Sequence, residues 1–368
     1  MTEKGSVPGA PTDVARQLSQ AISAVFAAED ITTGLGAGRG IRLQGQLLTD
    51  SDRAYAHIAR RFSEYGYTPL MRRQGGRVWV TAIPVVFSAK PTRDYAAILL
   101  FALTVVSALF AGAAAQAPDL QWILRHPLAG FPFAAGLLGI LVAHELGHYF
   151  VARRLGVSAS LPYFIPMPLS PFGTMGAVIR TRSPMHSRRD MLAVGAAGPL
   201  AGLVVAIPAL ILGLLRSQVL PIPAQEGIFI EGNSLLYAGL KLLVFGRILP
   251  RNGYDVFLHP LAFAAWAGLL VTALNLIPSG QLDGGHIAYA LLGRSARWLN
   301  RLAVVAAMAL GILWSGWFLW AAILLFLGQR NAEPLDDVTP LAASQKAFAV
   351  SMLVIFALLF TPVPMSIL

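Results

Sequence analysis

Cysteine is absent from this sequence of 368 residues. A disulfide framework and a thiolate metal site are therefore both excluded, and any metal must be bound by histidine, aspartate or glutamate. Charged residues are also scarce, at 12% of the chain against about 25% in an average soluble domain. Because hydrophobic residues make up 56%, the composition indicates an integral membrane protein with several spans.

The net charge of +10 does not indicate a nucleic-acid partner. The arginines form no basic patch interleaved with aromatic residues; they cluster beside the apolar runs, as the positive-inside rule describes. Residues 1–16 lack the basic start and apolar core of a signal peptide. We therefore expect the first span to act as its own insertion signal.

The pattern divides the chain into three parts. Residues 1–20 are expected to be a mobile tail, residues 21–94 a soluble α+β domain with its linker, and residues 95–368 a transmembrane domain. The soluble domain is either an accessory fold or a filter for substrates. Its linker into the membrane is Ser88–Arg93.

The soluble domain has the pattern strand, helix, hairpin. Residues 41–48 alternate in polarity, which predicts a strand. Asp50 and Asp52 can cap a helix with apolar residues at helical spacing, and Gly66 ends it. A Gly-Gly pair between residues 68–73 and 77–83 predicts a hairpin.

Six long apolar runs follow and predict a polytopic α-helical fold of about six spans. The fifth is long enough to tilt or to kink at Gly311 or Gly316. Arginine-rich loops alternate with weakly charged ones, so we expect both termini on the cytoplasmic side. The runs are residues 95–115, 131–152, 192–215, 260–278, 302–327 and 347–362.

Two stretches between the runs are not ordinary loops. Residues 161–179 are apolar but contain four prolines, so they cannot form a regular helix. Residues 174–180 favour an extended segment, either one edge of a short membrane-associated β-hairpin or a plain amphipathic connector. Residues 234–246 are too short to span and favour an interfacial helix on the outer side.

The second apolar run carries the pattern H-E-x-x-H at His144, Glu145 and His148. Charged residues inside a bilayer cost about 2.5–3.5 kcal/mol on insertion scales, so they mark function by default. Residues four apart on a helix project from one face, so the two histidines can bind one Zn²⁺. Glu145, beside that face, can act as a general base.

A third ligand is expected from another apolar run. The stretch after the fourth run contains one carboxylate, Asp283, flanked by proline and glycine residues that break the helix. We assign Asp283 as the third metal ligand. Asn275 either contacts substrate or oxyanion or fastens two helices together. His286 either supports the ligands or is an ordinary loop histidine.

Together these motifs resemble the site-2 protease family of intramembrane zinc metalloproteases. The resemblance rests on H-E-x-x-H at His144–His148 and on Asn275-x-x-Pro278 followed by Leu282-Asp283-Gly284. Gly173-Thr-Met-Gly176 is similar to the family's membrane-inserted hairpin, and Gly195–Gly202 to its small-residue third span. The soluble N-terminal domain resembles that of the bacterial and plastid-type subgroup. The sequence leaves no room for a PDZ domain between the two halves of the core.

The resemblance implies one zinc ion per chain, held by His144, His148 and Asp283, with Glu145 as base and Asn275 on the substrate or oxyanion. The implied substrate is the transmembrane helix of another protein, and the implied location is a bacterial cytoplasmic membrane or a plastid-type membrane. Two alternatives remain. A non-proteolytic zinc-binding scaffold or chaperone would not need Glu145, and a cation transporter usually has inverted repeats that are not found here.

Overall fold

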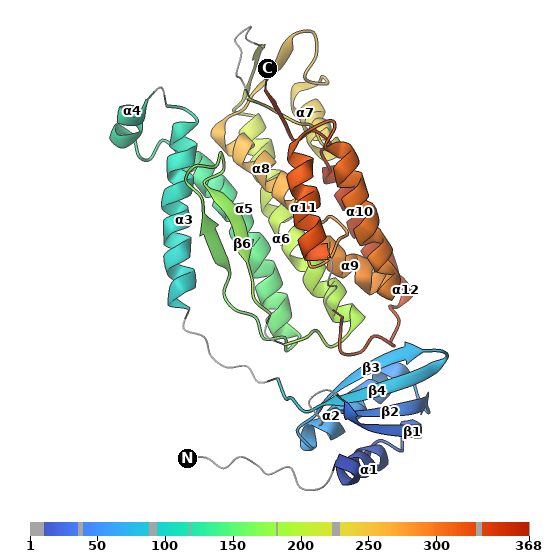
Figure 1. Ribbon diagram of the computed structural model, residues 1–368. Coiled ribbons are helices and arrows are strands. Elements are labelled where there is room, and N and C mark those ends of the chain that lie inside the picture. Colours follow the sequence, from blue (N-terminus) through green and yellow to red (C-terminus); the bar gives the residue numbers. More distant parts are fainter. Residues whose placement is uncertain are drawn as a thin grey trace. The chain divides into compact units, whose positions relative to one another are not determined.

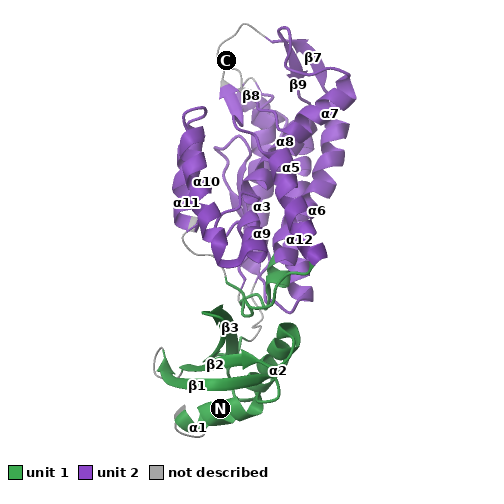
Figure 2. Ribbon diagram, turned by 90° about the vertical axis from the view of Figure 1, so that its right-hand side faces the viewer, with its two compact units in different colours: residues 1–90, 182–191, 333–342 green, residues 91–181, 192–332, 343–368 purple. Residues whose placement is uncertain are grey.

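The computed structural model describes seven stretches of the chain, and these form two compact units (Figure 2). The described stretches are residues 11–35, 40–87, 94–117, 119–181, 183–222, 229–328 and 333–367. Unit 1 comprises residues 1–90, 182–191 and 333–342, and unit 2 comprises residues 91–181, 192–332 and 343–368. The predicted linker at residues 88–93 lies outside the described residues.

Unit 1 is built on a four-stranded antiparallel sheet with the strand order β1-β2-β4-β3 (Figure 1). Its core contains side chains from both helices and from the sheet, including Leu18, Ile58 and Val80. The elements are α1 (Pro11–Ala21), β1 (Phe26–Leu35), β2 (Gly40–Leu47), α2 (Ser51–Glu64), β3 (Thr68–Gln74) and β4 (Arg77–Ile83).

The predicted strand, helix and hairpin are confirmed in β2, α2 and the β3–β4 pair. The Asp50 side chain accepts the Asp52 backbone N–H at 3.0 Å, as expected of a helix cap. The predicted mobile tail is wrong for residues 11–20, because α1 packs into the core through Leu18. Strand β1 was not predicted, because among its residues only Phe26 is fully buried and the pattern lacks apolar alternation.

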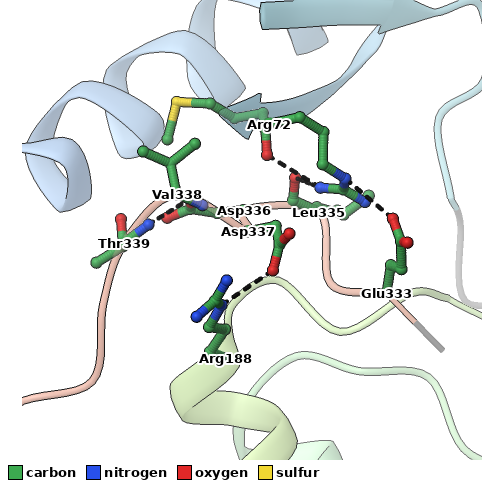
Figure 3. Close-up of polar contacts among 9 residues, drawn as sticks. Arg72, Arg188, Glu333, Leu335, Asp336, Asp337, Val338 and Thr339 are labelled. Atoms are coloured by element: carbon green, nitrogen blue, oxygen red, sulfur yellow. Dashed lines mark hydrogen bonds and ion pairs between the residues drawn. The ribbon is translucent and has the colours of Figure 1, made fainter. Parts of the chain in front are cut away.

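Two segments distant in sequence complete unit 1. Leu335 belongs to its core, and the Met71 backbone N–H donates to the Leu335 carbonyl at 2.8 Å. Two ion pairs hold the same region, one between Arg72 and Glu333 at 3.1 Å and one between Arg188 and Asp337 at 2.9 Å (Figure 3).

Unit 2 is a helical bundle with small two-stranded sheets. By length and composition, three described helices could cross a membrane: α3 (Tyr95–Ala114), α5 (Phe131–Arg154) and α6 (Arg188–Leu214), whose first turn lies in unit 1. Shorter helices complete the bundle. They are α4 (Leu120–Arg125), α7 (Leu235–Phe245), α8 (Pro260–Asn275), α9 (Asp283–Leu292), α10 (Ala296–Leu310), α11 (Gly316–Gly328) and α12 (Ala343–Leu359).

The prediction of a single fifth span is wrong. Residues 302–327 lie in two helices, α10 and α11, which pack side by side after a turn between Gly311 and Gly316 (Figure 1). The pair is antiparallel, because the Asn300 side-chain amide near the start of α10 donates to the Gly328 carbonyl at the end of α11, at 2.9 Å. The chain thus reverses at the glycines where a kink was expected.

The C-terminal strand lies at one end of unit 2. The C-terminal strand β10 (Met365–Ile367) pairs with β8 (Phe229–Glu231), and Met365 lines the same cavity as Gln116 beyond the end of α3. Strand β10 therefore lies at the end of unit 2 opposite to the start of α3. The expected cytoplasmic location of both termini stays a prediction.

The proline-broken stretch forms a β-hairpin of β5 (Tyr163–Pro166) and β6 (Thr174–Val178). The predicted extended segment is confirmed in β6, and β5 packs against α3. The predicted short helix at residues 234–246 is confirmed in α7, which Ser234 caps and Gly246 ends with a φ of +68°. A further sheet pairs β7 (Gln218–Pro221) with β9 (Tyr254–Phe257).

Candidate metal centre

Three side chains from two helices of unit 2 converge at one point. His144 and His148 lie one turn apart on α5, and Asp283 is the first residue of α9. The His144 Nε2 atom is 3.2 Å from Asp283 Oδ2, and the His148 Nε2 atom is 3.2 Å from Asp283 Oδ1. One donor atom of each residue lies within 4.8 Å of the other two, so the sequence-predicted ligands form one group.

The imidazole of His148 is oriented by α6. Its Nδ1–H donates to the Val194 carbonyl at 2.8 Å, which leaves Nε2 free to bind a metal. A Cβ on Gly198 would overlap the His148 ring, so only glycine allows α6 to approach this closely. The close packing expected of Gly195–Gly202 is thus found, but the sequence did not indicate that the helix also orients a ligand.

Asp283 is positioned by the break between α8 and α9. The helix ends at Asn275, and Gly280 in the connection has a φ of +54°, a conformation that favours glycine. The Gly280 backbone N–H donates to Asn300 Oδ1 at 3.0 Å, so a side chain of α10 holds the segment before the ligand. Sequence reasoning missed Asn300, a buried amide near the start of α10, because a single amide carries no spacing signal.

Glu145 and Asn275 flank the three-residue group. Glu145 is 6% exposed, and within the described part of the chain its carboxylate makes no hydrogen bond or ion pair. The Asn275 Nδ2 atom is 3.5 Å from His144 Nε2, which places the amide beside the group. Both residues therefore lie beside the three-residue group.

His286 lies outside the group. It follows Asp283 by three residues on α9, and its Cβ packs close to Gly195 of α6. Its Nδ1 atom is buried and has no hydrogen-bond partner among the described residues. The donor set is thus two imidazole nitrogens and one carboxylate oxygen, which fits the three-ligand sites that bind catalytic zinc and leave one position open.

The apolar helical bundle indicates a membrane protein. Its donor set and the adjacent glutamate form a candidate metal site inside the bundle. The family model described as Peptidase family M50 matches residues 132–315, which include all five residues of the site. The chain belongs to this family, the site-2 protease family.

Several plant proteins are similar to this chain. It is 34% identical over 288 residues to the Arabidopsis thaliana protein named "Probable zinc metalloprotease EGY2, chloroplastic", covering 77% of this chain and 50% of the relative. It is 31% identical to the EGY1 protein of the same plant, covering 73% and 53%, and 28% identical to the EGY3 protein of Oryza sativa subsp. japonica, covering 63% and 42%. The chain thus spans about half the length of the curated relatives it matches.

Proposed function

We propose that the chain is a zinc metalloendopeptidase that hydrolyses peptide bonds in or near transmembrane helices of other proteins. The observation that carries the proposal is the convergence of His144, His148 and Asp283, with Glu145 beside them, inside an apolar bundle. Membership of peptidase family M50 and the names of the relatives support the same chemistry. His144, His148 and Asp283 would hold one zinc ion per chain.

When bound, zinc supplies Lewis acidity that acidifies a water and polarises a carbonyl. In our proposal Glu145 accepts a proton from the attacking water at its carboxylate and returns it to the leaving amine nitrogen. The Asn275 amide donates to the oxyanion that develops on the scissile carbonyl. The buried surroundings of Glu145 exclude competing bulk water and strengthen both interactions.

The edge of β6 is our candidate for binding the substrate backbone. Strand β6 pairs with β5 on one side, and its residues Met175 and Val178 are exposed. A peptide bond can be attacked only in an extended, accessible backbone, and a strand edge binds such a segment through main-chain hydrogen bonds. The substrate helix would therefore unwind locally and add to this hairpin.

We propose that unit 2 is a multi-pass domain of a bacterial cytoplasmic membrane or a plastid-type membrane. Arg153 and Arg154 at the end of α5 support a cytoplasmic or stromal location for that end of the bundle. Strand β10 and α7 would then lie on the opposite face. The segment 21–94 would contribute a soluble α+β domain that selects substrates.

The test is cleavage of a model transmembrane substrate by purified protein, with the zinc content measured in parallel. Cleavage that a chelator abolishes and added Zn²⁺ restores is the expected result. Stoichiometric zinc without cleavage would favour the non-proteolytic scaffold, which would not need a general base at Glu145. Chelator-sensitive ion flux in vesicles without cleavage would favour the cation transporter.

A further inference from the structure

A groove runs between α10 and α11, outside the metal centre. Its volume is about 620 Å³, and its apolar walls are formed by Val304 and Val305 from α10 and by Leu324 and Leu325 from α11. Val305 and Leu325 are 64% and 51% exposed, so the groove opens on the outer surface of the hairpin. An open apolar groove on a helical hairpin of a membrane protein is suited to a hydrocarbon chain.

Two arginines lie at one end of this groove. Arg297 and Arg301 are four residues apart on α10, so they project from the same face, and both line the cavity. Within the described part of the chain, neither guanidinium forms an ion pair. Arg301 lies over the ring of Trp298, with 4.5 Å between the guanidinium carbon and the ring centroid, which restrains the side chain.

We propose that this groove binds an anionic phospholipid. The phosphate lies between the guanidinium groups of Arg297 and Arg301, and one acyl chain follows the apolar walls. Two guanidinium groups on one face favour an anionic headgroup over a zwitterionic one, because they carry two positive charges and form no ion pair with the residues that the structure describes. Lipid binding in this groove requires neither the proposed peptidase activity nor a bound metal.

The lipid site is connected to the segment that precedes Asp283. Asn300 lines the same groove, donates to the Gly328 carbonyl at 2.9 Å and accepts the Gly280 N–H at 3.0 Å. A lipid that holds α10 against α11 therefore also restrains the support of the Asp283 segment. Lipid bound in the groove is therefore expected to slow the local opening of the segment before Asp283.

The test measures lipid binding by native mass spectrometry on the full chain in a mild detergent. The purified protein is titrated with phosphatidylglycerol and, in separate arms, with phosphatidylcholine and inorganic phosphate. We expect saturable binding of phosphatidylglycerol at least ten-fold tighter than that of phosphatidylcholine, and no competition by inorganic phosphate at equal concentration. Equal binding of the two lipids would overturn the proposal, and competition by phosphate would show an ion site instead.

Two variants separate the headgroup contact from the groove. Arg297→Gln with Arg301→Gln is expected to weaken phosphatidylglycerol binding at least ten-fold, whereas the exposed pair Arg153→Gln with Arg154→Gln on α5 should leave it unchanged. Val305→Trp, at an exposed position, should block the acyl chain and abolish binding although both arginines remain. Wild-type affinity in either the double arginine variant or Val305→Trp would overturn the proposed site.

Discussion

Glu145 is the acidic residue of the centre that has no hydrogen-bond or ion-pair partner among the described residues. Asp283 lies within 3.2 Å of both histidines, whereas the Glu145 carboxylate forms no hydrogen bond or ion pair with a described side chain. A buried, unpaired carboxylate costs free energy, so its retention is best explained by chemistry rather than by stability.

Replacing Glu145 by Gln should remove proton transfer and leave the three donors in place. We expect cleavage of a transmembrane substrate to fall by about 10²–10⁴-fold, the usual contribution of a general base. Zinc measured by atomic absorption should stay at one ion per chain. Retention of full activity would exclude Glu145 as the base, and loss of zinc would make it a ligand.

Asp283→Asn and His286→Ala form a matched pair on α9. The first replaces a proposed ligand, and the second replaces a neighbour outside the donor group. We expect Asp283→Asn to lower zinc affinity by at least about ten-fold, as even the loss of a ligand's supporting partner does, and His286→Ala to leave it within about two-fold. Equal zinc loss in both variants would mean that α9 supports the site only through its packing.

Much of the residue-scale arrangement was predictable because helical spacing fixes His144 relative to His148. Asp283 could be assigned as the third ligand because it is the one carboxylate in a broken apolar stretch. The fourth apolar run, which precedes it, was also expected to cross the membrane in the same direction as the run that carries the histidines. The Val194 carbonyl and Asn300 were not predictable, because backbone groups and single amides carry no spacing signal. Their roles depend on which helices pack together, and that information is not local.

At the scale of elements, the packing of α6 against α5 determines the metal centre. A Cβ on Gly198 would overlap the His148 ring, whereas a Cβ on Gly202 would lie 3.4 Å from His144 Cβ, an ordinary contact. A side chain is therefore excluded at Gly198 but tolerated at Gly202, although both glycines occur in the same small-residue stretch.

Gly198→Ala is therefore expected to displace His148 and to lower zinc affinity by about ten-fold or more, whereas Gly202→Ala should be nearly neutral. Zinc titration of the two detergent-purified proteins measures the difference. Their helix content by circular dichroism should be equal, since alanine is a better helix former than glycine. Identical zinc affinities would show that α6 can move away at no cost.

The elements that were mispredicted share a physical cause. The fifth apolar run has the length and composition of a span, but Gly311 and Gly316 allow a reversal with closely packed aromatic rings at the turn. Helix α1 was missed because apolar spacing in a short polar segment is a weak signal. Strand β1 was missed because an edge strand with one solvated face needs few apolar residues.

At the scale of the whole molecule, unit 1 depends on a buried carboxylate in its last segment. Asp336 is 1% exposed, and its Oδ1 atom accepts the backbone N–H groups of Val338 at 2.9 Å and Thr339 at 3.1 Å (Figure 3). Burial raises the pKa of Asp336, although these hydrogen bonds act in the opposite direction. The folded protein therefore binds a proton here more tightly than the unfolded chain does.

Asp336 should make stability fall as pH rises from the carboxyl's ordinary pKa of about 4 to its raised value. Asp336→Asn keeps an acceptor and removes the charge. The thermal midpoint of this variant, relative to that of the wild type, should therefore rise as pH rises from about 4 towards neutrality. Asp336→Ala should lose about 1–3 kcal/mol near pH 4, because two partly buried N–H groups lose their acceptor, and the loss should shrink as pH rises. A pH-independent difference between the Asp336→Asn variant and the wild type would contradict the raised pKa.

The three-segment make-up of unit 1 also has a consequence for synthesis. Residues 333–342 leave the ribosome after every described helix of unit 2 except α12. Until then the core lacks Leu335, and Arg72 and Arg188 lack their acidic partners. Unit 1 therefore finishes folding late, and a nascent chain stopped at residue 332 would already contain His144, His148 and Asp283 while unit 1 was still incomplete.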